Sequence, residues 1–209
     1  MEFTQRAFVW GIMKAMATHD HMTLSDRHRA ARPAVAYSRA SVALHWLLAV
    51  LLIAQLVLGW WMVDLPKSPP GLRAGWFNVH KSVGIVLATL VALRLAWRAS
   101  HPVEEAAGLP PWQRAVAEGT HGMLYACMLL MPVSGFLGSA FTRHPIRFFG
   151  TVLPVPHADW PVAKQLMSDF HTATAYAFVA LVALHVAAAA WHWWQRDGIA
   201  ARMGIPSPR

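Results

Sequence analysis

Six of the twelve histidines lie within or beside long apolar segments, where an imidazole could serve as a metal ligand. They are His45, His80, His121, His171, His185 and His192. Ionisable side chains are costly inside a lipid bilayer and usually have a functional role there. Neutral imidazole is a common ligand of transition metals. The positions of these histidines therefore favour the binding of a transition metal within the membrane.

Two of these histidines share one face of a predicted helix. His171 and His185 are 14 residues apart, which is about 21 Å, or about four turns, along an α-helix. If consecutive segments cross in opposite directions, His45 matches His185 in depth and His80 matches His171. Two opposed imidazoles between helices are the axial ligands of six-coordinate haem. The spacing therefore predicts two haem sites, one near each membrane surface.

The surroundings of these four histidines also favour haem. Each is followed one turn later by a small residue, which leaves room for a flat macrocycle; the small residues are Ala49, Gly84, Ala175 and Ala189. Zinc is the competing metal, but it prefers three or four ligands in one cluster, whereas these pairs are about 21 Å apart. Arg39 and Arg94 lie near the predicted depth of His45 and are candidates to bind the propionates of that haem.

The elements that must position these residues are four long apolar segments. The chain is 56% hydrophobic and 13% charged, whereas an ordinary soluble domain has about 25% charged residues. A membrane-spanning helix needs about 20 apolar residues. We predict helices over about 40–63, 76–97, 119–142 and 169–195. The expected fold class is an all-α integral membrane four-helix bundle, and this composition argues against a nucleic-acid-binding protein.

The third segment contains a proline followed by two glycines. Pro132 removes a backbone donor from the middle of a helix and predicts a kink. Gly135 and Gly138 lie one and two turns later, and small residues allow a neighbouring helix to approach closely. We therefore expect this segment to be bent and closely packed.

Basic residues are unevenly distributed between the two sides of the predicted bundle. Twelve of the 18 lysines and arginines lie on the side that holds both termini, so the positive-inside rule predicts cytoplasmic termini. Residues 1–36 have neither a span nor a signal-peptide pattern. We predict that they form a poorly ordered cytoplasmic arm before the membrane domain, residues 37–209. An alternative is that translation starts at Met16 or Met22 and that the residues before it do not belong to the natural protein.

Several short motifs follow one another between Tyr37 and about Met203. They are Tyr37-Ser38-Arg39, Leu44-His45-Trp46, Asn78-Val79-His80-Lys81-Ser82-Val83-Gly84, Leu93-Arg94-Leu95, His121 with Tyr125, Met131-Pro132-Val133-Ser134-Gly135, Phe148-Phe149-Gly150, Phe170-His171 and Leu184-His185-Val186-Ala187-Ala188-Ala189 with His192. Their order and spacing resemble the bacterial cytochrome b561 family of four-helix, di-haem b membrane proteins. The resemblance implies a multi-pass protein of the bacterial inner membrane, with two haem b bound by His45, His185, His80 and His171.

The resemblance also implies an activity. The best-understood member of that family oxidises periplasmic superoxide to dioxygen and reduces ubiquinone. The expected partners are thus the lipid bilayer, superoxide and quinone. Lys81, Arg143 and Arg147 are expected at the outer surface, where cations attract an anionic substrate. His192, and less directly His121, lie on the cytoplasmic side and are candidates to contact the quinone and relay a proton.

Two other functions fit the same pattern. A cytochrome b subunit of a membrane hydrogenase or dehydrogenase uses a similar bundle, but receives its electrons from a partner subunit. A haem carrier or sensor binds haem without turnover. Small residues on the helix faces also leave open a homodimer or a protein partner.

Overall fold

Four long helices make up most of the protein. The computed structural model describes residues 37–68, 71–102, 109–156 and 158–206, so the predicted arm, residues 1–36, lies outside the described residues. The helices are α3 (Arg39–Val63), α4 (Leu72–Ser100), α5 (Pro111–Ala140) and α6 (Pro161–Gln195). Each is long and apolar enough to cross a membrane. The predicted class, an all-α membrane protein with four spanning helices, is confirmed.

Three of the helices begin before the apolar segments that predict them. α4 begins at Leu72 rather than near residue 76, α5 at Pro111 rather than near 119, and α6 at Pro161 rather than near 169. The added turns carry Arg73, Arg114, Glu118 and Lys164. A helix can continue beyond the bilayer core, where water solvates its charged side chains. Apolar composition therefore marks the span and not the ends of the helix.

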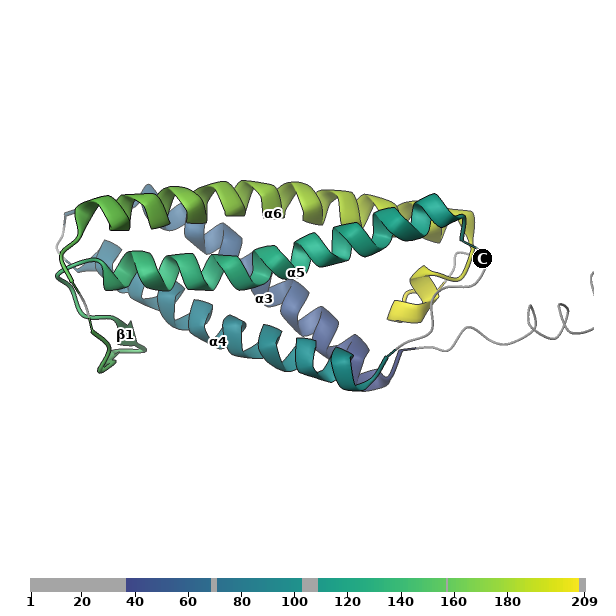
Figure 1. Cartoon of the computed structure of the whole chain (residues 1–209), viewed down its shortest axis with the longest axis horizontal. Helices are drawn as coiled ribbons and strands as arrows, with labels where there is room; N and C mark the ends of the chain where they lie inside the picture. The colour runs from purple at the N-terminus through teal and green to yellow at the C-terminus, as the bar shows by residue number, and fades with distance from the viewer. Residues whose placement is uncertain (1–36, 69–70, 103–108, 157, 207–209) are drawn as a thin grey trace, which may run out of the picture. The chain divides into compact units, whose positions relative to one another are not determined.

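Consecutive helices run in opposite directions and contact one another, α3 with α4, α4 with α5, and α5 with α6 (Figure 1). One end of the bundle holds the start of α3 and the end of α6, and we call it the terminal end. The other end holds β1 (Arg147–Phe148) and β2 (Thr151–Val152), and we call it the hairpin end. This alternation places the early residues of α4 and α6 at the hairpin end and the early residues of α3 at the terminal end.

The outer faces of the helices are apolar. In the most apolar stretch of each helix, at most 17% of the residues are buried. On α3, Val50, Ile53 and Val57 are 54 to 64% exposed, and their spacing places them on one side of the helix. A continuous apolar surface of this kind requires contact with lipid. The chain is therefore a multi-pass membrane protein.

The buried core fills the middle of the bundle. It consists of two clusters, the first made of Leu48, Leu87 and Val91 and the second of Leu124, Cys127 and Phe178. Leu52 and Met128 pack against both clusters and so join them. Phe178 lies midway between His171 and His185 along α6. The core therefore separates the depths of these two histidines.

The strands form a short antiparallel hairpin that is fixed to α4. The turn consists of Phe149 and Gly150, whose φ angles are 45° and 98°. Hairpin turns of two residues often need positive φ at both positions, but this conformation is unfavourable for an aromatic residue. The Phe149 N–H donates a hydrogen bond of 2.9 Å to the hydroxyl of Ser82, which is fully buried on α4. This bond holds the turn against the helix.

The C-terminal residues fold back over the terminal end. After α6, a left-handed residue, Arg196, turns the chain toward the short helix η1 (Ala200–Met203). The Trp46 indole N–H donates to the Met203 carbonyl over 3.1 Å, and the Trp193 indole donates to the Pro206 carbonyl over 2.8 Å. Two tryptophans thus tie the C-terminal segment to α3 and α6.

Candidate functional site

The structure brings together both of the predicted histidine pairs. Near the hairpin end, the rings of His80 on α4 and His171 on α6 have centroids 6.3 Å apart and planes 77° apart. Near the terminal end, His45 on α3 and His185 on α6 have centroids 6.2 Å apart and planes 68° apart. All four side chains are half-buried. The two pairs therefore have almost the same geometry at opposite ends of the bundle.

This spacing fits a metal ion bound between two imidazoles. A metal–imidazole bond is about 2 Å long, and each ring adds roughly 1 Å, so two ligands of one iron have centroids about 6 Å apart. Both pairs satisfy this requirement. Among the described residues, no group of three or more His, Cys, Asp or Glu could hold a metal ion. The donor sets therefore fit two-ligand haem iron better than a zinc cluster.

The surroundings of His80 also fit a bound haem. Its Nδ1 atom is buried and has no hydrogen-bond partner among the described residues. The ring lies against the backbone of Gly59 on α3, where an added Cβ atom would come within 3.2 Å of the His80 Cε1 atom. Its backbone carbonyl accepts a hydrogen bond of 2.7 Å from the Gln55 side chain. Gly59 therefore leaves just enough space for the imidazole, and Gln55 binds the backbone that carries it.

His171 is held by α5. Its Nδ1 atom lies 2.9 Å from the Met131 carbonyl oxygen and 3.2 Å from the Ser134 hydroxyl. A Cβ atom on Gly135 would lie 3.2 Å from both Nδ1 and Cε1 of the ring. The close packing expected after Pro132 thus occurs here. The sequence did not predict these contacts with His171.

At the terminal end, Arg94 lies beside the second pair. Its guanidinium donates to the Ser41 carbonyl over 3.2 Å, and its Nη2 atom lies 3.3 Å from Nδ1 of His45. Arg39, the other predicted propionate partner, is exposed in the first turn of α3. Of the two arginines, the structure therefore brings Arg94 to the histidine pair and leaves Arg39 on the surface.

His121 lies closer to the terminal pair than its position in the sequence suggests. Its ring centroid is 5.3 Å from that of His185, and the two planes are 66° apart. Two ligands of one iron need about 6 Å between centroids, so His45 is the better-placed partner of His185. His121 is a third imidazole beside this pair.

His192 pairs with a carboxylate that the sequence analysis missed. Its Nδ1 atom lies 2.5 Å from Oδ2 of Asp197, and Oδ1 of Asp197 accepts a hydrogen bond of 3.0 Å from the Ile199 N–H. The left-handed turn at Arg196 carries Asp197 back toward α6. The sequence feature that could have indicated this contact is Asp197 itself, which lies just after the predicted end of the helix and five residues after His192.

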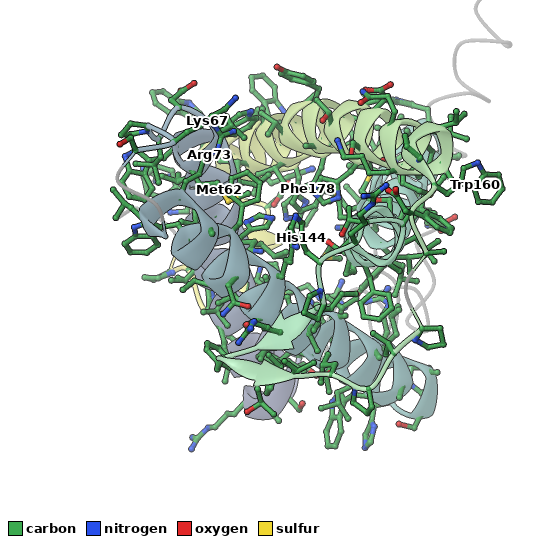
Figure 2. All side chains as sticks on the ribbon, turned by 90° about the vertical axis from the view of Figure 1, so that its left-hand side faces the viewer. Met62, Lys67, Arg73, His144, Trp160 and Phe178 are labelled. Carbon is green, nitrogen blue, oxygen red and sulfur yellow. The ribbon has the colours of Figure 1, made fainter. Side chains whose placement is uncertain are left out.

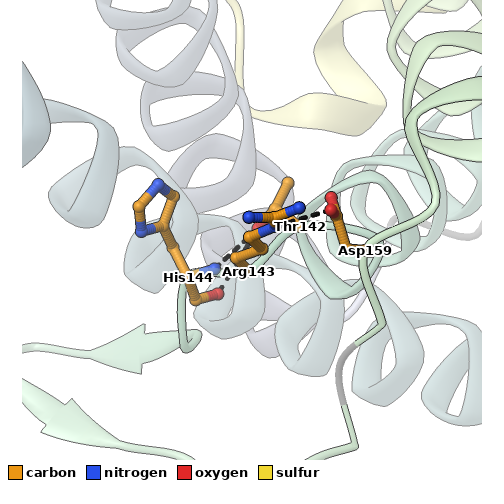
Figure 3. A network of polar contacts seen from close by, with 4 residues as sticks. All are labelled: Thr142, Arg143, His144 and Asp159. Atoms are coloured by element: carbon orange, nitrogen blue, oxygen red, sulfur yellow. Dashed lines mark hydrogen bonds and ion pairs between the residues drawn. The ribbon is translucent and has the colours of Figure 1, made fainter.

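The three basic residues predicted for the outer surface lie at the hairpin end but differ in their contacts. The Arg143 Nε atom donates to the Asp159 carboxylate over 2.5 Å (Figure 3), so Asp159 offsets its charge. Arg147 in β1 donates to the Gly150 carbonyl over 3.3 Å. Lys81 is half-buried and directly follows His80 on α4. The structure therefore favours Lys81 and Arg147 over Arg143 as sources of positive potential.

Two further basic residues lie at the same end. Figure 2, which views the bundle from the hairpin end, shows Lys67 and Arg73 close together. They line one shallow depression with Phe77, and the Arg73 guanidinium lies 5.4 Å from the centroid of that ring. The sequence analysis did not single out this pair, because Lys67 and Arg73 lie on either side of a loop.

Comparisons with known proteins agree with this arrangement. A family model described as Prokaryotic cytochrome b561 matches residues 36–204. Cytochrome b561 homolog 2 of Escherichia coli (strain K12) is 30% identical over 174 residues, which cover 80% of this chain and 90% of that protein. Cytochrome b561 homolog 1 of the same organism is 28% identical over 178 residues, which cover 80% of this chain and 96% of that protein.

Proposed function

Because the chain belongs to the prokaryotic cytochrome b561 family, whose members are transmembrane electron-transfer proteins that bind b-type haem, we propose that it oxidises superoxide and reduces ubiquinone. The overall reaction converts two superoxide ions, one ubiquinone and two protons into two dioxygen molecules and one ubiquinol. The observation that carries the proposal is the presence of two histidine pairs with the same spacing, one at each end of the bundle.

Each histidine pair would hold one haem. His80 and His171 would bind the haem at the hairpin end, and His45 and His185 the haem at the terminal end. When bound, haem b supplies an iron that accepts and passes on one electron at a time. Arg94 lies where it could neutralise a propionate beside His45. The chain would thus supply two pairs of histidine ligands and a cation, which would orient the haems and set their surroundings.

At the hairpin end, the role of the chain is to attract the substrate. Superoxide is an anion, and a cluster of cations raises its local concentration and its association rate. Lys81 lies next to His80, and Arg147 lies in the hairpin whose turn is fixed to Ser82. We place this end in the periplasm, in line with the positive-inside prediction made from the whole sequence.

The middle of the bundle separates the two ends. Leu48, Leu87 and Val91 form one buried cluster, and Phe178 belongs to the adjoining one. Among the buried residues of these two clusters, the only polar group is the weakly polar thiol of Cys127. Electrons would therefore cross this layer without protons, and the protons for ubiquinol would enter at the terminal end.

At the terminal end, His192 is the candidate proton donor to the quinone. Its Nδ1 atom faces Asp197, so its Nε2 atom remains available for a quinone oxygen. The carboxylate orients the ring, as in other His–carboxylate pairs. With this end in the cytoplasm of a bacterium, ubiquinol formation takes up cytoplasmic protons.

The proposal is tested by rapid mixing of the purified, haem-loaded protein with superoxide. We expect superoxide to reduce the haems, and added ubiquinone to reoxidise them with formation of ubiquinol. The absorbance of the haems and the amount of quinol measure the two steps. Haems that are not reduced by superoxide, together with a dehydrogenase subunit that co-purifies in equal amount, would instead favour a cytochrome b subunit. Haems that stay reduced in the presence of ubiquinone would favour a carrier or sensor.

The basic residues at the hairpin end lead to a graded prediction. We expect Lys81→Gln and Arg147→Gln each to slow superoxide oxidation by two- to tenfold at low ionic strength, since steering of an anion depends on local charge. Arg143→Gln should have a smaller effect, because Asp159 already offsets its charge. The measurement is the rate of haem reduction as a function of salt concentration.

The matched control is Arg98→Gln, because Arg98 is exposed at the terminal end of α4. It removes the same charge far from the hairpin end and should leave the rate unchanged. If all four variants lose the same amount of rate, the effect comes from the net charge of the protein and not from local steering.

A further inference from the structure

The segment Met131–Gly135 of α5 contacts one side of the His171 ring. The Met131 carbonyl lies 2.9 Å from Nδ1 and the Ser134 hydroxyl 3.2 Å from it. Ser134 is buried, with an exposed fraction of 2%. The motif Met131-Pro132-Val133-Ser134-Gly135 thus acts at a histidine 37 residues away along the chain.

These contacts determine which ring nitrogen carries the hydrogen. A carbonyl oxygen can only accept a hydrogen bond, so Nδ1 of His171 must be the donor. The Ser134 hydroxyl lies 2.7 Å from the Leu130 carbonyl and can donate to it, which leaves its oxygen free to accept from Nδ1 as well. The lone pair of His171 therefore lies on Nε2, the nitrogen available for a metal ion.

Position 135 leaves little room for a side chain beside this contact. A Cβ atom there would lie 3.2 Å from both Nδ1 and Cε1 of His171, which is closer than carbon atoms normally approach. His80 has a similar glycine, Gly59, but its Nδ1 has no hydrogen-bond partner among the described residues. The Nδ1 atom of His171 therefore has hydrogen-bond partners, whereas that of His80 has none among the described residues.

We propose that Met131, Ser134 and Gly135 form a cradle that positions His171 as an iron ligand and lowers the reduction potential of the haem it binds. The proposal rests on the haem assignment made above. An acceptor for the Nδ1 hydrogen makes the imidazole a stronger electron donor, which favours ferric over ferrous iron. Ser134 and Gly135 are thus positioning residues for this ligand.

The first test is the reduction potential of each haem in Ser134→Ala, measured by redox titration of absorbance. We expect the potential of one haem to rise and that of the other to stay unchanged. The matched control is Ser139→Ala on the same helix, since the Ser139 hydroxyl is also buried but donates to the Gly135 carbonyl over 2.9 Å. If Ser134→Ala shifts neither potential, or shifts both potentials equally, the proposal that the cradle lowers the potential of one haem is wrong.

The second test uses the steric limit at Gly135. In Gly135→Ala the added methyl group must displace the His171 ring, so we expect loss or a changed low-spin spectrum of one haem. Gly138→Ala is the control, because its added Cβ would make only an ordinary contact of 3.4 Å with the Met167 Cβ atom. Wild-type haem content and spectrum in Gly135→Ala would contradict the cradle.

A third variant separates failure of the cradle from failure of the haem assignment. If His171→Ala loses one haem while Ser134→Ala keeps both potentials unchanged, His171 is a ligand but Ser134 does not tune it. If His171→Ala keeps both haems with wild-type spectra, the haem assignment is wrong and the cradle is wrong with it. Haem content and potential are read without any assay of turnover.

Discussion

We expect His171→Ala to bind half of the haem that the wild-type protein binds, with the spectrum of the remaining haem unchanged. Without His171, only His80 would remain to hold a haem at the hairpin end. The other pair, His45 and His185, lies across the buried core and keeps its own contacts. His80→Ala should give the same result, because the two histidines form one site. Haem content per protein and the absorbance of the reduced haem are the measurements.

His121→Ala tests the pairing at the terminal end. Its ring lies 5.3 Å from that of His185, so this variant shows whether an imidazole beside the terminal pair matters for haem binding. We expect His121→Ala to keep both haems. Loss of a haem in His121→Ala, with both haems retained in His45→Ala, would make His121 the partner of His185 and overturn our pairing.

We expect His45→Ala to separate the two halves of the reaction. This variant loses the haem at the terminal end but keeps the one at the hairpin end, so superoxide should still reduce the remaining haem. Ubiquinol formation should fall by more than about 100-fold, because even loss of a residue behind a metal ligand costs 10- to 100-fold. Haem absorbance and quinol formation, followed in the same mixture, measure the two halves.

The comparison variant is His192→Ala. It should keep both haems and full reduction by superoxide, but form ubiquinol more slowly because the candidate proton donor is missing. Full quinol formation in His45→Ala would show that quinone reacts at the hairpin end instead, and would refute the order of electron transfer that we propose.

Features that depend on position along a helix could be predicted from the sequence. The long apolar segments predicted four spans, and the family follows from motifs distributed along most of the chain. The depth of each histidine follows from its distance to the end of its span, because an α-helix has a fixed rise per residue. Depth alone already matched His45 with His185 and His80 with His171, and the structure brings both pairs together.

Features that depend on contacts between segments required the tertiary structure. His121 lies beside His185, Asp159 offsets Arg143, and Asp197 pairs with His192. The Ser82 hydroxyl binds the turn at Phe149, and Ser134 binds His171. Each contact depends on the rotation of a helix about its axis or on the path of a loop.

The physical reason is the difference between local and non-local interactions. Apolar length and helical rise are set by neighbours along the chain, so the sequence by itself determined the spans and the depths of the histidines. The rotation of each helix and the approach at Gly59 and Gly135 arise from packing between helices, because lipid favours no particular face of an apolar helix. Only the tertiary structure therefore decided which side chains contact the four central histidines.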